Sequence, residues 1–384
     1  MITKTPPKTA SILCVGNGWF PETPGGAERY VYEFIHQLSS QGDRVELCAV
    51  DLPSNGVQTS LLLTNLASAQ RPLPQRLWTS QRQFQQRVLE VPDAINLHFA
   101  LYSFPLLRSL PKNVSITFTF HGPWAGESEQ EGQSTWGTTL KQWMEYQVYH
   151  RCDRFIVLSK AFGMILHQRY DIPWEQIHII PGGVNTTRFQ PNLSRQVARE
   201  KLGWDVDRPI LFTPRRLAQR MGLDKLLSAI AQVKRQVPDV WLAIAGKGSI
   251  RSALEQQIQA LDLSQNVQLL GFVPDELLPV AYQAADLTVM PSQSLEGFGL
   301  VLLESLACGT PALCTPVGGM PEVLSPFSQH LITESPQAEA IADRLLELLT
   351  ARLPLPSRIA CRDYAVTRFD WQTIAPQVRQ VLLS

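Results

Sequence analysis

Residues 287–315 read LTVMPSQSLEGFGLVLLESLACGTPALCT, and this stretch decides the fold. It contains two short apolar runs, 287–290 and 311–315, on either side of an apolar helical run over 298–307. Two strands joined by a helix form a crossover unit, which belongs to a parallel sheet. Neither run alternates polar and apolar residues, as expected for strands covered on both faces. The stretch therefore predicts a doubly wound α/β domain.

The same alternation extends outward in both directions. Further strand-like runs lie at 210–213, 240–245 and 267–270, and the first half repeats the pattern less regularly, with runs at 12–15, 45–50, 94–98, 115–120 and 155–158. We expect an α/β protein of two Rossmann-like, doubly wound domains that face an interdomain cleft. The predicted domains are 1–190 and 191–368, and the last helix, 369–384, is expected to pack back on the first domain.

The composition excludes several classes of protein. The chain has 384 residues, enough for two domains, of which 44% are hydrophobic and 18% charged. Its 34 basic side chains balance 34 acidic ones, so a nucleic-acid binder driven by bulk charge is not expected. The six cysteines include no C-x-x-C pair, and no apolar run is long enough for a membrane span or a signal peptide. We therefore expect a cytoplasmic protein.

Three loops after predicted strands carry chemistry, because ligands of open parallel sheets bind beyond the carboxyl ends of the strands. Gly25 and Gly26 open a helix whose N–H groups favour a phosphate, although a tight turn is the simpler interpretation. His121 follows a later strand and is either a hydrogen-bond donor into the cleft or a structural histidine. Arg216 and Arg220 follow the first strand of the second domain, where guanidinium groups suit a diphosphate or form a solvated cluster.

The segment 296–304 gives the most informative signal. Glu304 interrupts an otherwise apolar helix, and a buried carboxylate needs hydrogen-bond donors such as a ribose diol. Two glycines leave the N–H groups of residues 298–300 at the positive end of that helix, ready for phosphate oxygens. Glu296 comes just before them and is placed to meet hydroxyls of a transferred group. The structural alternative is one glutamate in the first helical turn and one buried glutamate paired with arginine.

Taken in order, these motifs resemble those of the retaining glycosyltransferases of family four, which have the GT-B fold. The resemblance covers nearly the whole chain. It rests on nine elements: PGGAE at 24–28, HG at 121–122, IVLS at 156–159, IPGGVN at 180–185, RL at 216–217, AGKG at 245–248, GFV at 271–273, the glutamate pair 296 and 304 followed by ACGTP at 307–311, and VGG at 317–319.

The resemblance implies a nucleotide-sugar donor held mainly by domain 191–368, a hydroxyl acceptor on domain 1–190, and transfer with retention at the anomeric carbon. It implies catalytic roles for His121 and Glu296. The donor-binding residues that it implies, together with our own assignment of Arg220, are Gly25, Gly26, Arg216, Arg220, Val273, Phe298, Gly299, Leu300 and Glu304. Among these, Glu304 is implied to bind the ribose, Arg216 the diphosphate and Val273 the base.

Two positions depart from the family pattern. The family commonly has Lys-Gly where this chain has Met221-Gly222, and our hypothesis is that Arg220 replaces the lysine. Asn185 stands where the family usually has aspartate, and we expect only a local capping change there. The string Asp205-Val206-Asp207 resembles a metal-binding motif of other glycosyltransferases but is interpreted as a turn. We expect no metal and no cofactor, the nucleoside-diphosphate sugar being a co-substrate.

Two other functions stay open: a sugar-nucleotide epimerase on the same fold, and a sugar-nucleotide-binding pseudoenzyme in which Met221 marks lost chemistry. A third open point concerns residues 71–88, where four arginines alternate with Leu77, Trp78, Phe84 and Val88. An ordinary packed surface helix is the preferred interpretation, and peripheral contact with an anionic membrane is the alternative.

Four aromatic residues precede the predicted strand at 155–158. They are Trp136, Trp143, Tyr146 and Tyr149. We interpret them as core or helix-packing residues, with stacking on an acceptor sugar as the alternative.

Overall fold

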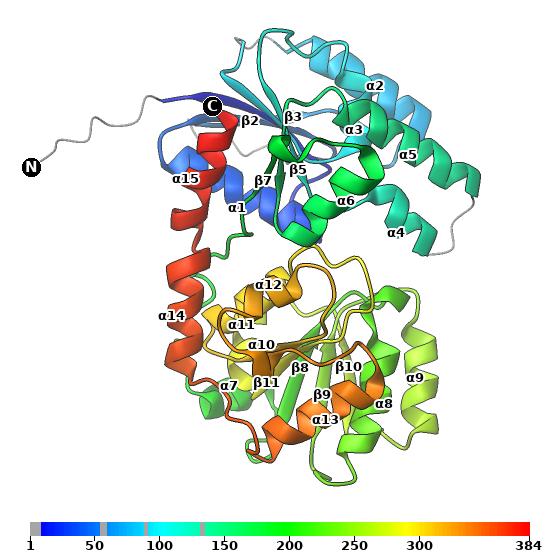
Figure 1. Ribbon diagram of the computed structural model, residues 1–384, viewed down its shortest axis with the longest axis vertical. Helices are drawn as coiled ribbons and strands as arrows, with labels where there is room; N and C mark the ends of the chain where they lie inside the picture. The colour runs from blue at the N-terminus through cyan, green and yellow to red at the C-terminus, as the bar shows by residue number, and fades with distance from the viewer. Residues whose placement is uncertain (1–8, 54–59, 88–90, 131–134) are drawn as a thin grey trace, which may run out of the picture. The chain divides into compact units, whose positions relative to one another are not determined.

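The computed structural model describes residues 9–53, 60–87, 91–130 and 135–384 (Figure 1). It divides into two compact units, one of Met1–Pro181 with Trp371–Ser384 and the other of Gly182–Asp370. The sequence predicts the corresponding boundaries at residues 190 and 368. The two parallel sheets confirm the prediction of two Rossmann-like, doubly wound domains. Among the described residues no helix is both long and apolar enough to cross a membrane.

The first unit contains a seven-stranded parallel sheet in the order β3-β2-β1-β4-β5-β6-β7. Its strands are β1 (Ser11–Val15), β2 (Arg44–Ala49), β3 (Leu61–Asn65), β4 (Ala94–Leu97), β5 (Ile116–Phe120), β6 (Arg154–Val157) and β7 (Ile177–Ile179). Strands β4 and β5 are buried over their whole length, and β5 consists of the β-branched and aromatic residues ITFTF, which favour strands. The strand order reverses between β1 and β4, so the loops after these two strands open at the switch point.

Helices cover both faces of this sheet, as the crossover connections require. They are α1 (Gly26–Ser40), α2 (Leu73–Gln85), α3 (Ala100–Ser103), the 3-10 helix η1 (Phe104–Leu106), α4 (Trp124–Gln130), α5 (Thr135–Tyr149), α6 (Lys160–Tyr170), the 3-10 helix η2 (Trp174–Gln176) and α15 (Trp371–Leu382). Helix α1 buries one face, which includes Val31, Phe34, Ile35 and Leu38. Ser159, from the IVLS motif, caps α6 by accepting a hydrogen bond from the N–H of Phe162.

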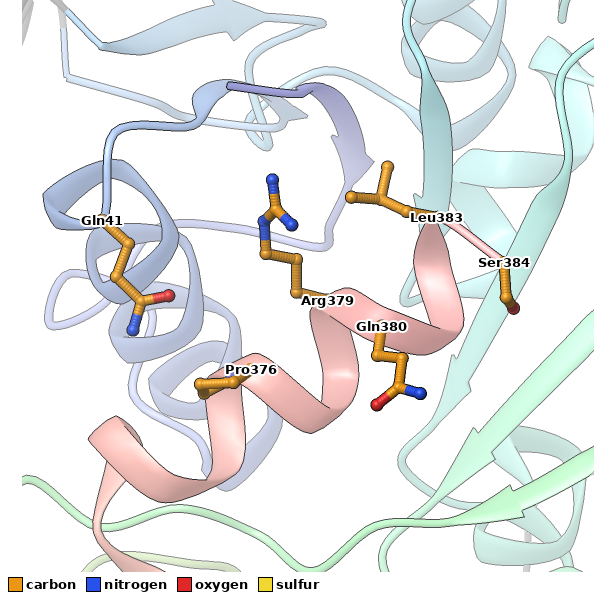
Figure 2. A pocket seen from close by; sticks show the side chains of 6 residues that line it. All are labelled: Gln41, Pro376, Arg379, Gln380, Leu383 and Ser384. Atoms are coloured by element: carbon orange, nitrogen blue, oxygen red, sulfur yellow. The ribbon is translucent and has the colours of Figure 1, made fainter. Parts of the chain in front are cut away.

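The last helix, α15, belongs to the first unit and packs on α1. Trp371 contacts the rings of Tyr30 and Phe34, with centroids 5.0 and 6.1 Å apart. Arg379 makes two hydrogen bonds of 2.6 and 2.8 Å to the buried carboxylate of Asp43. A cavity of about 630 Å³ lies beside this contact. Figure 2 shows the residues that line it, Gln41, Pro376, Arg379, Gln380, Leu383 and Ser384. Helix α15 is therefore an integral part of the first unit.

The second unit contains a five-stranded parallel sheet in the order β10-β9-β8-β11-β12. The strands are β8 (Ile210–Pro214), β9 (Trp241–Ala245), β10 (Val267–Gly271), β11 (Leu287–Met290) and β12 (Ala312–Cys314). The helices are α7 (Arg195–Leu202), α8 (Leu223–Val233), α9 (Arg251–Ala260), α10 (Leu278–Ala284), α11 (Leu300–Ala307), α12 (Met320–Leu324), α13 (Ala338–Leu349) and α14 (Arg358–Phe369), with the 3-10 helices η3 (Gln219–Met221) and η4 (Gln329–Leu331). Segment 287–315 forms the predicted strand-helix-strand unit.

Candidate functional site

The second unit has its switch point between β8 and β11, where the strand order reverses. The loops that leave these two strands, 215–222 and 291–299, therefore open at the same place on the sheet, where α/β proteins bind ligands. Both loops carry residues predicted from the sequence, and backbone contacts join them: the N–H of Gln293 donates to the carbonyl of Arg220 at 2.8 Å.

Glu296 lies in this loop pair as an ion-paired carboxylate. Arg215 makes a short hydrogen bond and ion pair to its Oε2, and Ser292 donates to the same oxygen at 3.1 Å. Burial acts to raise the pKa of Glu296, but the charge and hydrogen bond of Arg215, with the charge of Arg220 and the hydrogen bond of Ser292, bring that pKa below its ordinary value. Glu296 is thus held ionised, oriented and largely shielded from water.

Arg215 is a residue of this candidate site that the sequence interpretation missed. Its neighbour Arg216 is the one assigned to the site, and in the structure the side chain of Arg216 is exposed. The side chain of Arg215 is only 8% exposed and contacts both Ser292 and Glu296. Arg215 is the first residue beyond β8, but the sequence carries no signal that separates it from Arg216.

Two glycine motifs fix the backbone of these loops. Gly318 has φ +58°, and a Cβ on it would lie 1.8 Å from the carbonyl oxygen of Glu296. A Cβ on Gly246 would lie 1.9 Å from the carbonyl oxygen of Arg215. Only glycine allows such close backbone approach. The VGG and AGKG motifs therefore hold Glu296 and Arg215 in place from the neighbouring β12 and β9 loops.

Helix α11 begins at Leu300, two residues later than the sequence predicts. Gly299 caps it with φ +82°, a left-handed conformation that ends the preceding loop. The hydrogen bonds found for the described residues include none donated by the N–H groups of Phe298, Gly299 or Leu300. These N–H groups form the positive end of α11, which suits an anion. Gly182 of the IPGGVN motif packs directly against Phe298 and Leu300.

Glu304 lies inside α11 and is 6% exposed. Tyr282 of α10, itself fully buried, donates its hydroxyl proton to Glu304 Oε2 at 2.6 Å. The carboxylate thus has a buried hydrogen-bond donor within the second unit. Arg362 of α14 binds the carbonyl of Ala307 at the end of the same helix, at 3.0 Å.

The remaining predicted residues of this unit, Arg220 and Val273, lie in loops that follow strands of the same sheet. Arg220 donates to the carbonyl of Leu295 at 3.0 Å, so it supports the loop that carries Glu296. Met221, at the usual position of the lysine, is buried. Val273 follows β10 and is partly buried, beside the exposed Phe272, over whose ring Lys247 lies at 5.4 Å.

Local hydrogen bonds explain two further motifs, the Asp205-Val206-Asp207 string and Asn185. Asp205 accepts a hydrogen bond from the N–H of Asp207 at 2.9 Å, which makes this string a turn before β8. Asn185 Oδ1 accepts hydrogen bonds from Thr187 and from the N–H of Arg188, so Asn185 caps its own loop.

In the first unit, His121 is paired with a second histidine that the sequence interpretation did not single out. His98, 4% exposed, follows β4 at the switch point, and its Nδ1 lies 3.1 Å from Nε2 of His121. One ring must donate and the other accept, so the pair is tied to matched tautomers. The ring of Tyr30 packs edge-on against His121 at 5.0 Å. A signal for the pair is present in the sequence, because the predicted strand 94–98 ends in His98 and His121 directly follows the predicted strand 115–120.

Burial makes both histidines prefer the neutral form. It lowers the pKa of His121 to about 4. Burial, followed by the charge that His121 would carry, lowers the pKa of His98 well below its ordinary value. His121 is therefore a neutral hydrogen-bonding group at physiological pH rather than a cation.

A buried glutamate fixes the turn that follows His121. The side chain of Glu145 accepts hydrogen bonds from the N–H of Trp124 at 2.7 Å and of Ala125 at 3.4 Å, at the start of α4. It also accepts from the hydroxyls of Tyr170 at 2.8 Å and Tyr149 at 3.3 Å. Burial is the largest influence on the pKa of Glu145 and raises it, despite these four hydrogen bonds.

The predicted glycine pair at 25–26 opens α1 as expected. Gly25 is the N-cap, and a Cβ on it would lie 2.1 Å from Oε2 of Glu28, whose Oε1 accepts from Asn17 at 2.7 Å. The space above Gly25 is thus taken by the carboxylate of Glu28. A Cβ on Gly26 would meet nothing within 4 Å.

The lowered histidine pKa values predict a pH dependence of stability. The neutral forms stabilise the fold fully above about pH 6.5, and this contribution is lost as the pH falls toward 4, by at most about 1.4 kcal/mol per pH unit for each histidine. The urea midpoint, measured from pH 7 to 4.5, should fall less steeply in His121→Asn than in the parent chain. His330→Asn, at an exposed histidine, is the control and should follow the parent; equal slopes in all three proteins would contradict the assignment.

Comparison with known proteins gives two family matches that together cover most of the chain. The family model described as "Glycosyltransferase Family 4" matches residues 24–188, and the family model described as "Glycosyl transferases group 1" matches residues 194–367. A curated relative, the GDP-mannose-dependent alpha-(1-6)-phosphatidylinositol monomannoside mannosyltransferase of Mycolicibacterium smegmatis, is 31% identical over 55% of this chain and 57% of its own length. The chain spans about half the length of the curated relatives it matches.

Two solved structures share the fold. Sucrose-phosphate synthase from Thermosynechococcus elongatus has a TM-score of 0.81 at 22% identity, covering 97% of this chain and 98% of that one. A structure from Anabaena in complex with UDP and glucose has a TM-score of 0.75 at 19% identity, covering 97% and 99%.

Proposed function

Because this chain belongs to the glycosyltransferases of family four, with the GT-B fold, we propose that it transfers a sugar from a nucleoside-diphosphate donor to a hydroxyl acceptor, with retention at the anomeric carbon. The observation that carries the proposal is the arrangement around α11. Glu296, held ionised by Arg215, is followed by three helix-start N–H groups and by the buried Glu304.

In this proposal the second unit binds the sugar donor. The N–H groups of residues 298–300 bind phosphate oxygens, and Arg216 and Arg220 supply positive charge to the diphosphate. Glu304 accepts hydrogen bonds from the ribose hydroxyls, and Val273 lies beside the base. Glu296, which must accept hydrogen bonds because it is ionised, binds hydroxyls of the sugar.

The first unit supplies His121, which we assign to the donor sugar, and Gly25 and Gly26, which we assign to the phosphate. A neutral His121 donates a hydrogen bond without bringing a full positive charge to a developing oxocarbenium ion, and its tautomer is set by His98. Transfer with retention then needs no nucleophilic side chain: the acceptor attacks from the face that the phosphate leaves, and the departing phosphate takes its proton. Stabilisation of the phosphate charge supplies most of the rate.

The acceptor is a glycan, a lipid or a small molecule. If the acceptor is a lipid, the protein contacts the membrane surface to reach it. The six cysteines are all buried free thiols, which supports a reducing, cytoplasmic location. No metal or other cofactor enters the proposal.

A panel of UDP-, GDP- and ADP-sugars tests the proposed function directly. A donor that binds the folded chain should raise its melting temperature by mass action, and the same donor should then be hydrolysed or its sugar transferred to an acceptor. The anomeric configuration of the product, followed by NMR, tests retention. No binding across the panel would overturn the proposal. Binding without turnover would favour the pseudoenzyme, and interconversion of donors without an acceptor would favour the epimerase.

Replacing Arg220 tests whether it takes the place of the family lysine. We expect Arg220→Ala to raise the donor KM or lower kcat about tenfold or more, because it removes a cation near the diphosphate and the contact with the carbonyl of Leu295. Arg220→Lys, which keeps the charge, is the matched control and should retain more activity. Steady-state kinetics that are unchanged in Arg220→Ala would reject the substitution hypothesis.

A further inference from the structure

Helix α5 presents an apolar, aromatic face to solvent. Trp136 is 89% exposed, Leu140 58%, Trp143 50% and Tyr146 43%. Their spacing of three or four residues places all four along one side of the helix. We call this set the α5 stripe. The exposure of Trp136 and Tyr146 corrects their interpretation as core or helix-packing residues. That interpretation is right for the buried Tyr149 and for Trp143, whose ring packs against Phe104.

Trp143 of the α5 stripe contacts the ring of Phe104, but a different face of α5 forms its main attachment to the first unit. That face carries the buried side chains of Thr138, Met144, Glu145 and Val148. The exposed residues of α5 include no charged side chain, although a helix facing water ordinarily carries its charges there. A contiguous exposed apolar patch of this kind marks an interaction site.

Basic residues lie beside the α5 stripe. Helices α2 and α5 both contact η1, and Phe104 of η1 packs edge-on against Trp143 at 5.1 Å. The segments 71–87, 99–114 and 135–150 contain seven basic residues, Arg71, Arg76, Arg82, Arg87, Arg108, Lys112 and Lys141. Their one acidic residue is the buried Glu145. Arg87 is only 11% exposed and is paired with Glu46, and α4, which packs on α5, adds Glu127 and Glu129. The excess of positive charge on this side of the first unit therefore comes from the other six basic residues.

Helix α2 alone does not form the amphipathic membrane segment considered from the sequence. Its Phe84 is buried in the core and Leu77 packs against it, as in an ordinary surface helix. Val88 lies outside the described residues. Trp78, however, is 60% exposed, with the guanidinium of Arg82 5.6 Å from its ring centroid. Helix α2 thus contributes one aromatic residue and positive charge.

We infer that the α5 stripe and the arginines of α2 form a docking surface for an anionic lipid bilayer. Tryptophan and tyrosine prefer the interfacial layer of a membrane, where the ring is buried and its polar atom stays hydrated. Arginines at the same surface attract anionic headgroups. A second copy of the chain fits less well, because a symmetric contact would bring two positive surfaces together. The inference is independent of the transfer reaction.

Vesicle sedimentation with the full chain tests the inference. The chain should bind phosphatidylcholine vesicles that contain about one-third phosphatidylglycerol, bind vesicles of phosphatidylcholine alone much more weakly, and dissociate at about 0.5 M salt. The double variant Trp136→Ser with Leu140→Ser should lose about tenfold or more in partitioning, because each side chain is buried only in the bound state. The double variant Arg82→Gln with Arg108→Gln should reduce the part of the vesicle binding that is lost at high salt.

The matched control replaces exposed apolar residues of the second unit, Val197→Ser with Ile359→Ser, and should bind like the parent. Unchanged melting temperatures show that every variant folds. Equal binding by the α5 double variant, or no binding of the parent to anionic vesicles, would overturn the inference. A dimer in light scattering that the α5 double variant abolishes, without vesicle binding, would assign the surface to a second copy instead.

Discussion

Glu304→Ala should lower the affinity for the nucleotide-sugar donor more than about a hundredfold, because two charge-assisted hydrogen bonds to the ribose diol would be lost together. Glu304 is 6% exposed and is held by Tyr282, so the carboxylate is oriented before the ligand arrives. Isothermal calorimetry with a donor identified in the panel gives the measurement.

The proposed contact is with the ribose, which supplies a sharper test. The bare nucleoside diphosphate and the nucleotide sugar should lose affinity for Glu304→Ala by the same factor. Glu296→Ala, in contrast, should weaken only the sugar-bearing ligand, because Glu296 is assigned to the sugar hydroxyls. Tyr282→Phe keeps the carboxylate while removing its 2.6 Å hydrogen bond and should cost about tenfold or less. Wild-type affinity in a folded Glu304→Ala would remove this residue from the site.

Glu145→Ala should destabilise the protein by about 3 kcal/mol or more. Two N–H groups at the start of α4 and two tyrosine hydroxyls would lose their acceptor in a buried environment, where each unsatisfied group costs about 1–3 kcal/mol. The free energy of unfolding, measured by urea denaturation, provides the check.

Matched substitutions separate this buried network from charge in general. Glu145→Gln keeps an acceptor oxygen and should lose less stability than Glu145→Ala. Glu129→Ala removes an exposed glutamate, paired with Arg169 at 3.1 Å, and should change the free energy by less than about 1 kcal/mol. A Glu145→Ala midpoint equal to that of the parent would show that the hydrogen bonds contribute nothing.

The fold could be predicted because strand and helix periodicities are local properties. Segment 287–315 shows both, and the structure contains the expected β11, α11 and β12. The apolar pattern predicts the start of α11 two residues too early. The left-handed conformation of Gly299 depends on contacts of its loop, and a pattern of apolar residues contains no information about them.

The site is less accessible from sequence because it depends on how strands are ordered. Arg215 and Arg216 are identical residues next to each other in the sequence. Only the direction of the chain where it leaves β8 decides that Arg215 reaches Glu296. His98 and His121 are 23 residues apart, and their contact follows from the pairing of β4 with β5. The α5 stripe shows a third limit: helical periodicity identifies an apolar face, but it does not say whether that face is buried.

The return of α15 to the first unit has a consequence for biosynthesis. Trp371 and Arg379 complete the contacts around Tyr30 and Asp43, yet the ribosome adds them only after residues 182–370. Domains that are continuous in sequence fold as they emerge. Here the first unit cannot complete its packing until residues 182–370 have been translated, so part of its apolar surface stays exposed during that time. We expect this interval to be the one in which the nascent chain depends most on chaperones.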